Sequence, residues 1–78
     1  MPTINKSGEK TNKTFAKRIR ITREKMGLTQ EQLGKLLGIS GARVSDYELM
    51  RKSPDMRTLA KMGKKLKVSL DWLLGVFE

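Results

Sequence analysis

Large apolar side chains recur every three or four residues through most of this chain, from Phe15 to Leu74. This spacing puts them on one face of an α-helix, and no window shows the every-second-residue alternation of a half-buried strand. The pattern predicts five short helices with short connections, which make a compact all-α domain. Their predicted inner faces are Phe15, Ile19, Thr22 and Met26; Leu33, Leu36 and Leu37; Val44 and Tyr47; Leu59, Met62, Gly63 and Leu66; and Leu70, Leu73 and Leu74.

Capping residues and glycines predict where these helices begin and end. Asn12 or Thr14 can cap the first helix, and Gly27 suits its left-handed end. Thr29 and Gln32 have the spacing of a capping box at the start of the second helix. The other predicted boundary residues are Gly38, Ser40, Asp55, Ser69 and Gly75.

The chain has room for one small domain. Residues 1–13 contain three lysines (Lys6, Lys10 and Lys13) and one large aliphatic residue after Met1, Ile4, so we expect a flexible basic arm there. The folded domain is predicted over residues 14–75, and residues 76–78 are predicted to form a short apolar C-terminal tail.

Composition excludes several classes of function. The 78 residues include no Cys and no His, which removes thiolate chemistry and the two commonest metal-binding side chains. The longest apolar run is three residues, Trp72-Leu73-Leu74, far below the roughly 20 that span a membrane or the 7–15 of a signal peptide. We therefore predict a cytoplasmic module that is no enzyme, needs no cofactor or metal, and has no small-molecule substrate.

The net charge of +9 indicates a polyanionic partner, and it is unevenly distributed. Residues 1–28 carry +6, residues 29–49 carry −1 and residues 50–78 carry +4. A nearly neutral middle segment therefore lies between two basic flanks.

The neutral segment has the spacing of a helix-turn-helix. Gly34 falls where the second helix would pass the third, and a residue without a side chain permits close backbone approach there. Gly38 follows in the tight turn, where a positive φ is cheap for glycine. In such a motif the second of the two helices can enter the DNA major groove. An ordinary αα-hairpin is the alternative interpretation.

These residues resemble a known family. The segments GLTQEQLGKLLGIS (27–40), VSDYE (44–48) and LAKMGKKLKVSLDWLL (59–74), with Pro54 between them, are similar to the phage-repressor and Cro-type helix-turn-helix family, also called the XRE family. The resemblance implies a five-helix lambda-repressor-like fold, a recognition helix in third position, and a homodimer on double-stranded DNA. It therefore implies a sequence-specific transcriptional regulator, a repressor in many relatives.

The resemblance also implies roles for individual residues. Gln30 matches a glutamine that donates to a DNA phosphate, with a solvated polar residue as the alternative. We add Ser40, Arg51, Lys52 and Lys13 as predicted phosphate contacts. Lys6 and Lys10 of the arm can act in the same way, and a solvated charge is the alternative for any single lysine. Base contacts are predicted from the exposed face of the recognition helix: Gly41, Ala42, Arg43, Ser45 and Asp46. Arg43 can donate two bonds to guanine or hold a phosphate, and Asp46 can accept from a cytosine amine. The two residues are three apart and can instead pair with each other.

Arg23 and Glu48 match a structural ion pair that joins the first helix to the end of the third. Two departures from the family pattern stand out. Leu49-Met50 replaces a segment that often contains glycine, so the third helix must end differently here. Gly63 replaces a usual alanine, which softens the fourth helix by up to about 1 kcal/mol.

The apolar residues at the C-terminus leave a second function open. Trp72, Val76 and Phe77 need not all fit inside so small a core, and we predict that they form the dimer interface. They also fit a protein-interaction module on the same fold, such as an antitoxin or a bridging coactivator. A cationic membrane-surface peptide would account for the first helix alone.

Overall fold

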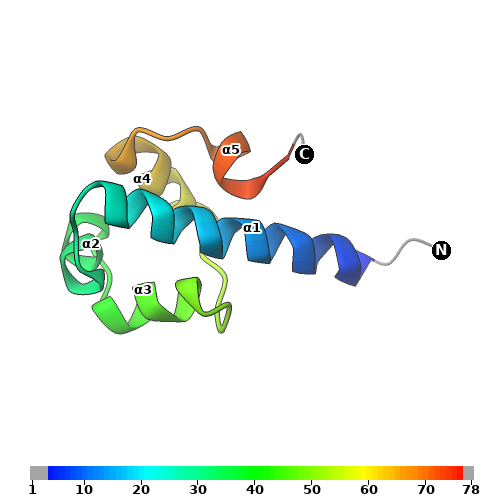
Figure 1. The fold of residues 1–78 in the computed structure, drawn as a ribbon, viewed down its shortest axis with the longest axis horizontal. Coiled ribbons are helices and arrows are strands. Elements are labelled where there is room, and N and C mark those ends of the chain that lie inside the picture. Colours follow the sequence, from blue (N-terminus) through cyan, green and yellow to red (C-terminus); the bar gives the residue numbers. More distant parts are fainter. Residues whose placement is uncertain (1–3, 77–78) are drawn as a thin grey trace.

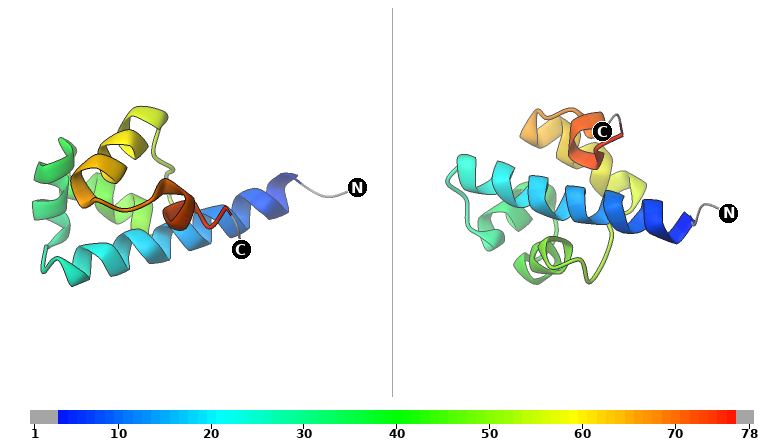
Figure 2. Two further views of the ribbon diagram at one scale, coloured as in Figure 1. Left: turned by 90° about the horizontal axis from the view of Figure 1, so that it is seen from above. Right: turned by 45° about the vertical axis from the view of Figure 1, so that its right-hand side comes forward.

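A computed structural model describes the backbone of residues 4–76 and the side chains of residues 10–76. Its described part contains five α-helices and no strand, which confirms the predicted all-α fold (Figure 1). The helices are α1 (Ile4–Lys25), α2 (Gln30–Leu37), α3 (Gly41–Glu48), α4 (Met56–Leu66) and α5 (Leu70–Leu74). In Figure 1 and in the right-hand view of Figure 2, α2 and α3 lie along one side of α1, and α4 and α5 lie along another.

The first helix begins earlier than predicted. It starts at Ile4 rather than near Asn12 or Thr14, so the prediction that the helix starts after an arm of 13 residues is wrong. At 1.5 Å per residue, a 22-residue helix is about 33 Å long, and its N-terminal end projects beyond the other helices (Figures 1 and 2). Once the part that packs on the core is helical, each further residue adds a hydrogen bond without a new nucleation step. No proline interrupts residues 4–13.

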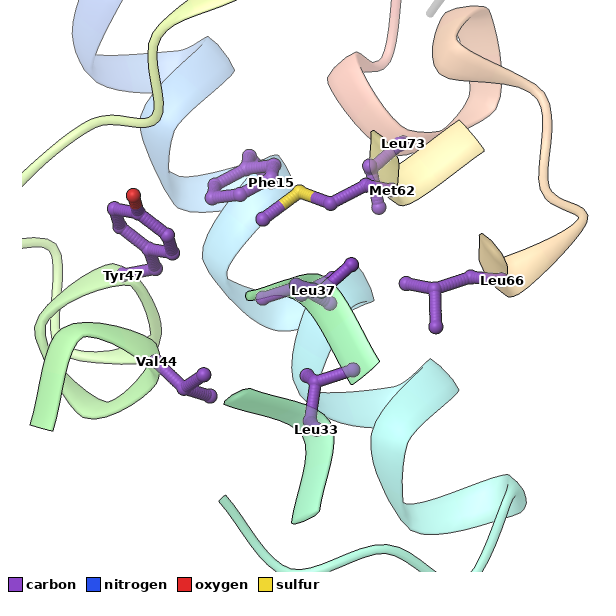
Figure 3. Packing of buried hydrophobic residues seen from close by; sticks show 9 residues of the cluster. Phe15, Leu33, Leu37, Val44, Tyr47, Met62, Leu66 and Leu73 are labelled. Atoms are coloured by element: carbon purple, nitrogen blue, oxygen red, sulfur yellow. The ribbon is translucent and has the colours of Figure 1, made fainter. Parts of the chain in front are cut away.

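The core receives side chains from all five helices (Figure 3). The ring of Phe15 on α1 meets the ring of Tyr47 on α3 edge to face, with 6.1 Å between the centroids. The other buried members of this cluster are Ile19, Leu33, Leu37, Val44, Met62, Leu66 and Leu73. This cluster is what holds the short helices, because helices of five to eleven residues are marginal alone.

Two residues predicted for the inner faces are exposed instead. Met26 is exposed because α1 ends at Lys25, one residue before it. Leu36 lies at the edge of α2, since Leu33 and Leu37 occupy the centre of its buried face. Helical spacing alone did not distinguish the centre of a face from its edge.

The predicted caps of α2 to α5 are present. The Thr29 hydroxyl accepts from the Gln32 backbone N–H at 3.1 Å, and the Gln32 side chain accepts from the Thr29 N–H at 2.9 Å, which completes the capping box. Gly38 ends α2 with a φ of 74°, as the tight turn requires. The side chains of Ser40, Asp55 and Ser69 cap α3, α4 and α5.

The end of α3 is built without glycine. Leu49 is the C-cap, and Met50 adopts a left-handed conformation with a φ of 61°. The Met50 N–H donates to the Tyr47 carbonyl, and the Arg51 N–H donates to the Asp46 carbonyl at 2.8 Å. This is the hydrogen-bond pattern of a Schellman motif, in which glycine normally holds the Met50 position. A side chain there costs about 1–2 kcal/mol.

Replacing Met50 with glycine is therefore expected to stabilise the protein by about 0.5–1 kcal/mol, since the relief of strain exceeds the extra chain entropy of glycine. Urea unfolding of the variant and the parent measures this. Leu49→Gly is the matched control, because Leu49 has a φ of −96° and glycine there gains nothing. A variant Met50→Gly less stable than the parent would contradict this account of the turn.

Candidate nucleic-acid interface

The backbones of α2 and α3 touch at Gly34. A Cβ at this position would lie 2.6 Å from the Ile39 carbonyl oxygen and 2.9 Å from the Ser40 carbonyl carbon. The close approach predicted for Gly34 is thus present, and it fixes how α3 leaves the turn. Gly41 makes a similar approach, because its Cβ would lie 3.0 Å from the Cα of Glu31 in the first turn of α2.

The recognition-helix residues divide between the core and the surface. Val44 and Tyr47 are buried, whereas Ala42 and Arg43 are exposed and Ser45 and Asp46 are half-buried. Small residues at the start of α3 leave an open hollow between α2 and α3. Its lining residues are Gln30, Glu31, Gly41, Ala42 and Ser45. The fold thus brings Gln30 next to the predicted base-reading helix.

An ion pair ties α1 to the end of α3. The Nε of Arg23 donates to Oε2 of Glu48 at 2.6 Å, and its Nη2 donates to Oε1 at 3.1 Å. The Arg23 and Glu48 side chains are only 13% and 4% exposed. A third bond, from Nη1 to the Leu28 carbonyl at 2.9 Å, occupies the rest of the guanidinium fork. The hydrogen bond to Glu48 raises the pKa of Arg23 further above its ordinary value, against the opposing effect of burial.

Gln30 joins this pair, which the sequence did not indicate. Its Nε2 donates to Oε1 of Glu48 at 3.1 Å. A side-chain amide has two N–H donors, so one remains for a phosphate at the start of α2. The contact fixes the orientation of the amide. No motif predicted it, because 18 residues separate Gln30 from Glu48 and their approach depends on how α2 and α3 pack.

Asp46 of α3 lies near a lysine in the turn that follows the helix. Lys52 Nζ lies 4.0 Å from Oδ2 of Asp46, whereas the described ion pairs do not join Asp46 to Arg43. Arg43 instead acts on Asp55, the N-cap of α4. The pKa of the Asp55 carboxyl is lowered first by the hydrogen bond from the Thr58 N–H at 2.8 Å and further by the charges of Arg57 and Arg43.

This lowered pKa predicts a loss of stability in acid. The carboxylate stabilises the fold fully above its unfolded-state pKa of about 3.9, and this contribution disappears as the pH falls through the lower folded-state pKa. Asparagine caps about as well without a charge. The free energies of unfolding of the parent and of Asp55→Asn are expected to differ above about pH 4 and to converge below it. Urea midpoints across this range test the prediction, and a constant difference would contradict it.

The remaining predicted phosphate contacts lie on three elements. Lys13 is exposed on α1, Arg51 and Lys52 are exposed in the turn before α4, and Ser40 is exposed at the start of α3. The Ser40 hydroxyl already accepts from the Arg43 N–H at 3.0 Å. The side chain of Lys6 lies outside the described residues.

The predicted interface residues lie at α5. Trp72 and Val76 are exposed, and Phe77 lies outside the described residues. Arg18 of α1 holds Trp72 in place, because its guanidinium carbon lies 5.0 Å from the ring centroid and its Nη1 donates to the Trp72 carbonyl. The ring is thereby fixed with part of its surface in solvent.

The described residues offer neither a metal-binding cluster nor a helix that could span a membrane. No group of three or more His, Cys, Asp or Glu side chains there could hold a metal ion. Within the same part of the chain, none of the helices has the length and apolar character needed to cross a membrane.

Comparison with known proteins agrees with this geometry. A helix-turn-helix family model matches residues 19–73. The HTH-type transcriptional regulator ImmR of Bacillus subtilis is 37% identical over 65 residues, which are 83% of this chain and 51% of ImmR. Repressor protein C2 of Salmonella phage P22 is 36% identical over 60 residues, which are 77% of this chain and 28% of the repressor. The chain thus spans about half the length of ImmR and less of the phage protein.

A solved structure shares the fold. The crystal structure of the P22 c2 repressor protein in complex with synthetic operator 9T, in the presence of Tl+, matches with a TM-score of 0.73 and 35% identity. The match covers 77% of this chain and 91% of that one. Together with the match over residues 19–73, this places Gly34, the Arg23–Glu48 pair and α3 inside the shared region. The chain belongs to the XRE-type helix-turn-helix family.

Proposed function

We propose that this chain is a sequence-specific DNA-binding module of a transcriptional regulator, and that it acts as a repressor in the cytoplasm. The observation that carries the proposal is the contact between α2 and α3 at Gly34, which places Gln30 beside the exposed face of α3. The similar P22 c2 protein is a repressor and was solved on an operator, which supports this choice. Catalysis has no part in the proposal.

Segments of different charge are proposed to contact the DNA backbone and the bases. The flanking segments, with +6 and +4, attract the DNA backbone, while the segment of −1 carries the residues proposed to read bases. One amide N–H of Gln30 donates to a phosphate, and Ser40, Arg51, Lys52 and Lys13 make further phosphate contacts. Affinity for random DNA should then fall steeply with salt.

Arg43 is proposed as the principal base-reading residue, because it is exposed near the start of α3 and carries two donors for guanine. Gly41, Ala42, Ser45 and Asp46 complete the reading face. Gly41 has no side chain and Ala42 has a single methyl group, so neither can reach far toward a base. The Asp46 carboxylate lies near Lys52. Much of the discrimination should therefore come from DNA shape.

Selection of bound sites from a random duplex pool, followed by mutation of Arg43, tests the function. The parent is expected to enrich one two-fold symmetric sequence, and Arg43→Ala to lower affinity for it about tenfold with little change on random DNA. Lys64→Ala, on an exposed position of α4, is the matched control. The proposal would be overturned if no sequence were enriched. It would also be overturned if Arg43→Ala and Lys64→Ala had equal affinities for the selected sequence.

We further propose that two copies bind together through α5, with Trp72, Val76 and Phe77 in the interface. The partly exposed ring of Trp72, fixed by Arg18, supports this choice. A two-fold dimer predicts half-sites about 34 Å apart. Light scattering with and without the selected DNA tests it, and a chain that stays monomeric on its site defeats it. A monomer that enriches no DNA sequence would instead favour the protein-interaction module.

A further inference from the structure

A second hollow lies beside the C-terminal end of α3, and Glu48 is one of the residues that line it. It is open to solvent, has a volume of about 390 Å³, and lies between the middle of α1 and the turn after α3. Ser53 in that turn donates to Asn12 of α1 at 3.3 Å, which holds the two segments side by side. The residues that line the hollow are Lys13, Ala16, Lys17, Arg20, Glu48, Leu49 and Met50.

The side formed by the turn is apolar. Leu49 and Met50 are adjacent in sequence, and each exposes about half of its surface, at 54% and 51%. Met50 has a φ of 61°, where glycine would be unstrained, so the fold keeps a large apolar side chain at an unfavourable backbone position. Such strain in a surface turn points to a role for the side chain outside folding.

The side formed by α1 is cationic. Lys13, Lys17 and Arg20 follow one another at helical spacing and line the hollow together. Glu48 is the one acidic residue among its lining residues, and its oxygens already accept bonds from Arg23 and Gln30. Arg20 pairs with Glu24 at 3.3 Å, whereas no ion pair among the described residues joins Lys13 or Lys17. The hollow therefore offers apolar surface with the positive charge of Lys13 and Lys17 at its edge.

We propose that this hollow, here called the α1–turn hollow, binds an acidic protein segment that carries a large apolar side chain. The apolar side chain would cover Leu49 and Met50, and flanking carboxylates would pair with Lys13 and Lys17. A DNA backbone could satisfy the lysines, but its sugars and phosphates offer less apolar surface than a large apolar side chain to cover Leu49 and Met50. Charge complementarity and the exposed apolar pair together therefore favour a protein segment.

Two model peptides test the proposal without DNA. Both have twelve residues and the same number of Glu residues; one carries Leu and Phe at its centre, and the other carries Ser at those positions. With fluorescein labels and anisotropy detection, the full chain is expected to bind the Leu/Phe peptide at least tenfold more tightly. Met50→Gly, which relieves strain and stays folded, should remove most of that difference. Met56→Ala is the control, because Met56 is exposed outside the hollow.

The charges are tested with the double variant Lys13→Gln/Lys17→Gln, which should weaken binding of both peptides at least fivefold. Equal affinity for the Leu/Phe and Ser peptides would overturn the proposal, and so would a Met50→Gly variant that binds like the parent. If the double variant lost affinity only for a random 20-base-pair duplex, the hollow would be a phosphate-binding surface instead. Failure of the random-pool selection leaves these peptide measurements unaffected, so the two proposals fail separately.

Discussion

Replacing Glu48 with alanine is expected to destabilise the protein by about 3–5 kcal/mol, because the change leaves the Arg23 guanidinium buried without its carboxylate. The same change removes the acceptor for the Gln30 amide. A small domain has a total stability of only about 5–15 kcal/mol, so much of the fold's stability is lost. Urea unfolding followed by circular dichroism measures the effect.

The exposed pair Arg20–Glu24 is the matched control. Its nitrogen and oxygen lie 3.3 Å apart, but the two side chains are 63% and 55% exposed, so Glu24→Ala should change stability by about 0.5 kcal/mol or less. The double replacement Arg23→Met/Glu48→Leu should recover much of the loss, since it removes both charges. If Glu48→Ala were as mild as Glu24→Ala, the Arg23–Glu48 pair would not be the structural link described above.

Gly34→Ala is expected to destabilise the protein by about 3 kcal/mol, at the upper end of typical overpacking effects. The new Cβ would lie 2.6 Å from the Ile39 carbonyl oxygen and 3.0 Å from the Gly41 nitrogen. These are backbone atoms of the turn, which cannot turn aside as a flexible side chain can. The variant must therefore separate α2 from α3, and its affinity for the selected DNA should fall together with its stability.

Gly63→Ala provides the comparison, because it adds the same methyl group inside α4. Its Cβ would lie 3.3 Å from Cδ2 of Leu70, the end of a side chain that can adjust. The gain in helix propensity opposes the tight contact, so the stability should stay within about 1 kcal/mol of the parent. Thermal or urea unfolding of Gly34→Ala and Gly63→Ala measures the stability change of each variant relative to the parent. Equal effects at Gly34 and Gly63 would show that the α2–α3 contact is not tightly constrained.

Most of the fold was predictable from local signals. The apolar spacing placed all five helices, and Thr29, Ser40, Asp55 and Ser69 cap helices where the sequence predicted. Each of these signals lies within four residues of the feature that it predicts, so it needs no knowledge of the rest of the chain. The start of α1 was not predicted, because residues 5–14 carry no large apolar side chain that would mark a helical face, although Thr3, a capping residue type, precedes Ile4.

The candidate interface was predictable only in part. The resemblance to the family put Arg23 with Glu48, and the structure brings the two together. It did not put Gln30 on the same carboxylate or Lys52 beside Asp46. Both contacts depend on exact helix orientations, which residue types at matched positions do not specify. The left-handed Met50 was foreseen only as an unusual helix end.

The sequence by itself thus determined the helices, their caps, the glycine contact of the helix-turn-helix and the family to which they point. Only the tertiary structure decided which apolar residues stay in solvent and where the hollow between α1 and the turn after α3 lies. The reason is the sequence separation over which each kind of signal acts. Helical spacing and capping act over a single turn, whereas the approach of Lys13 to Met50 depends on how whole helices pack.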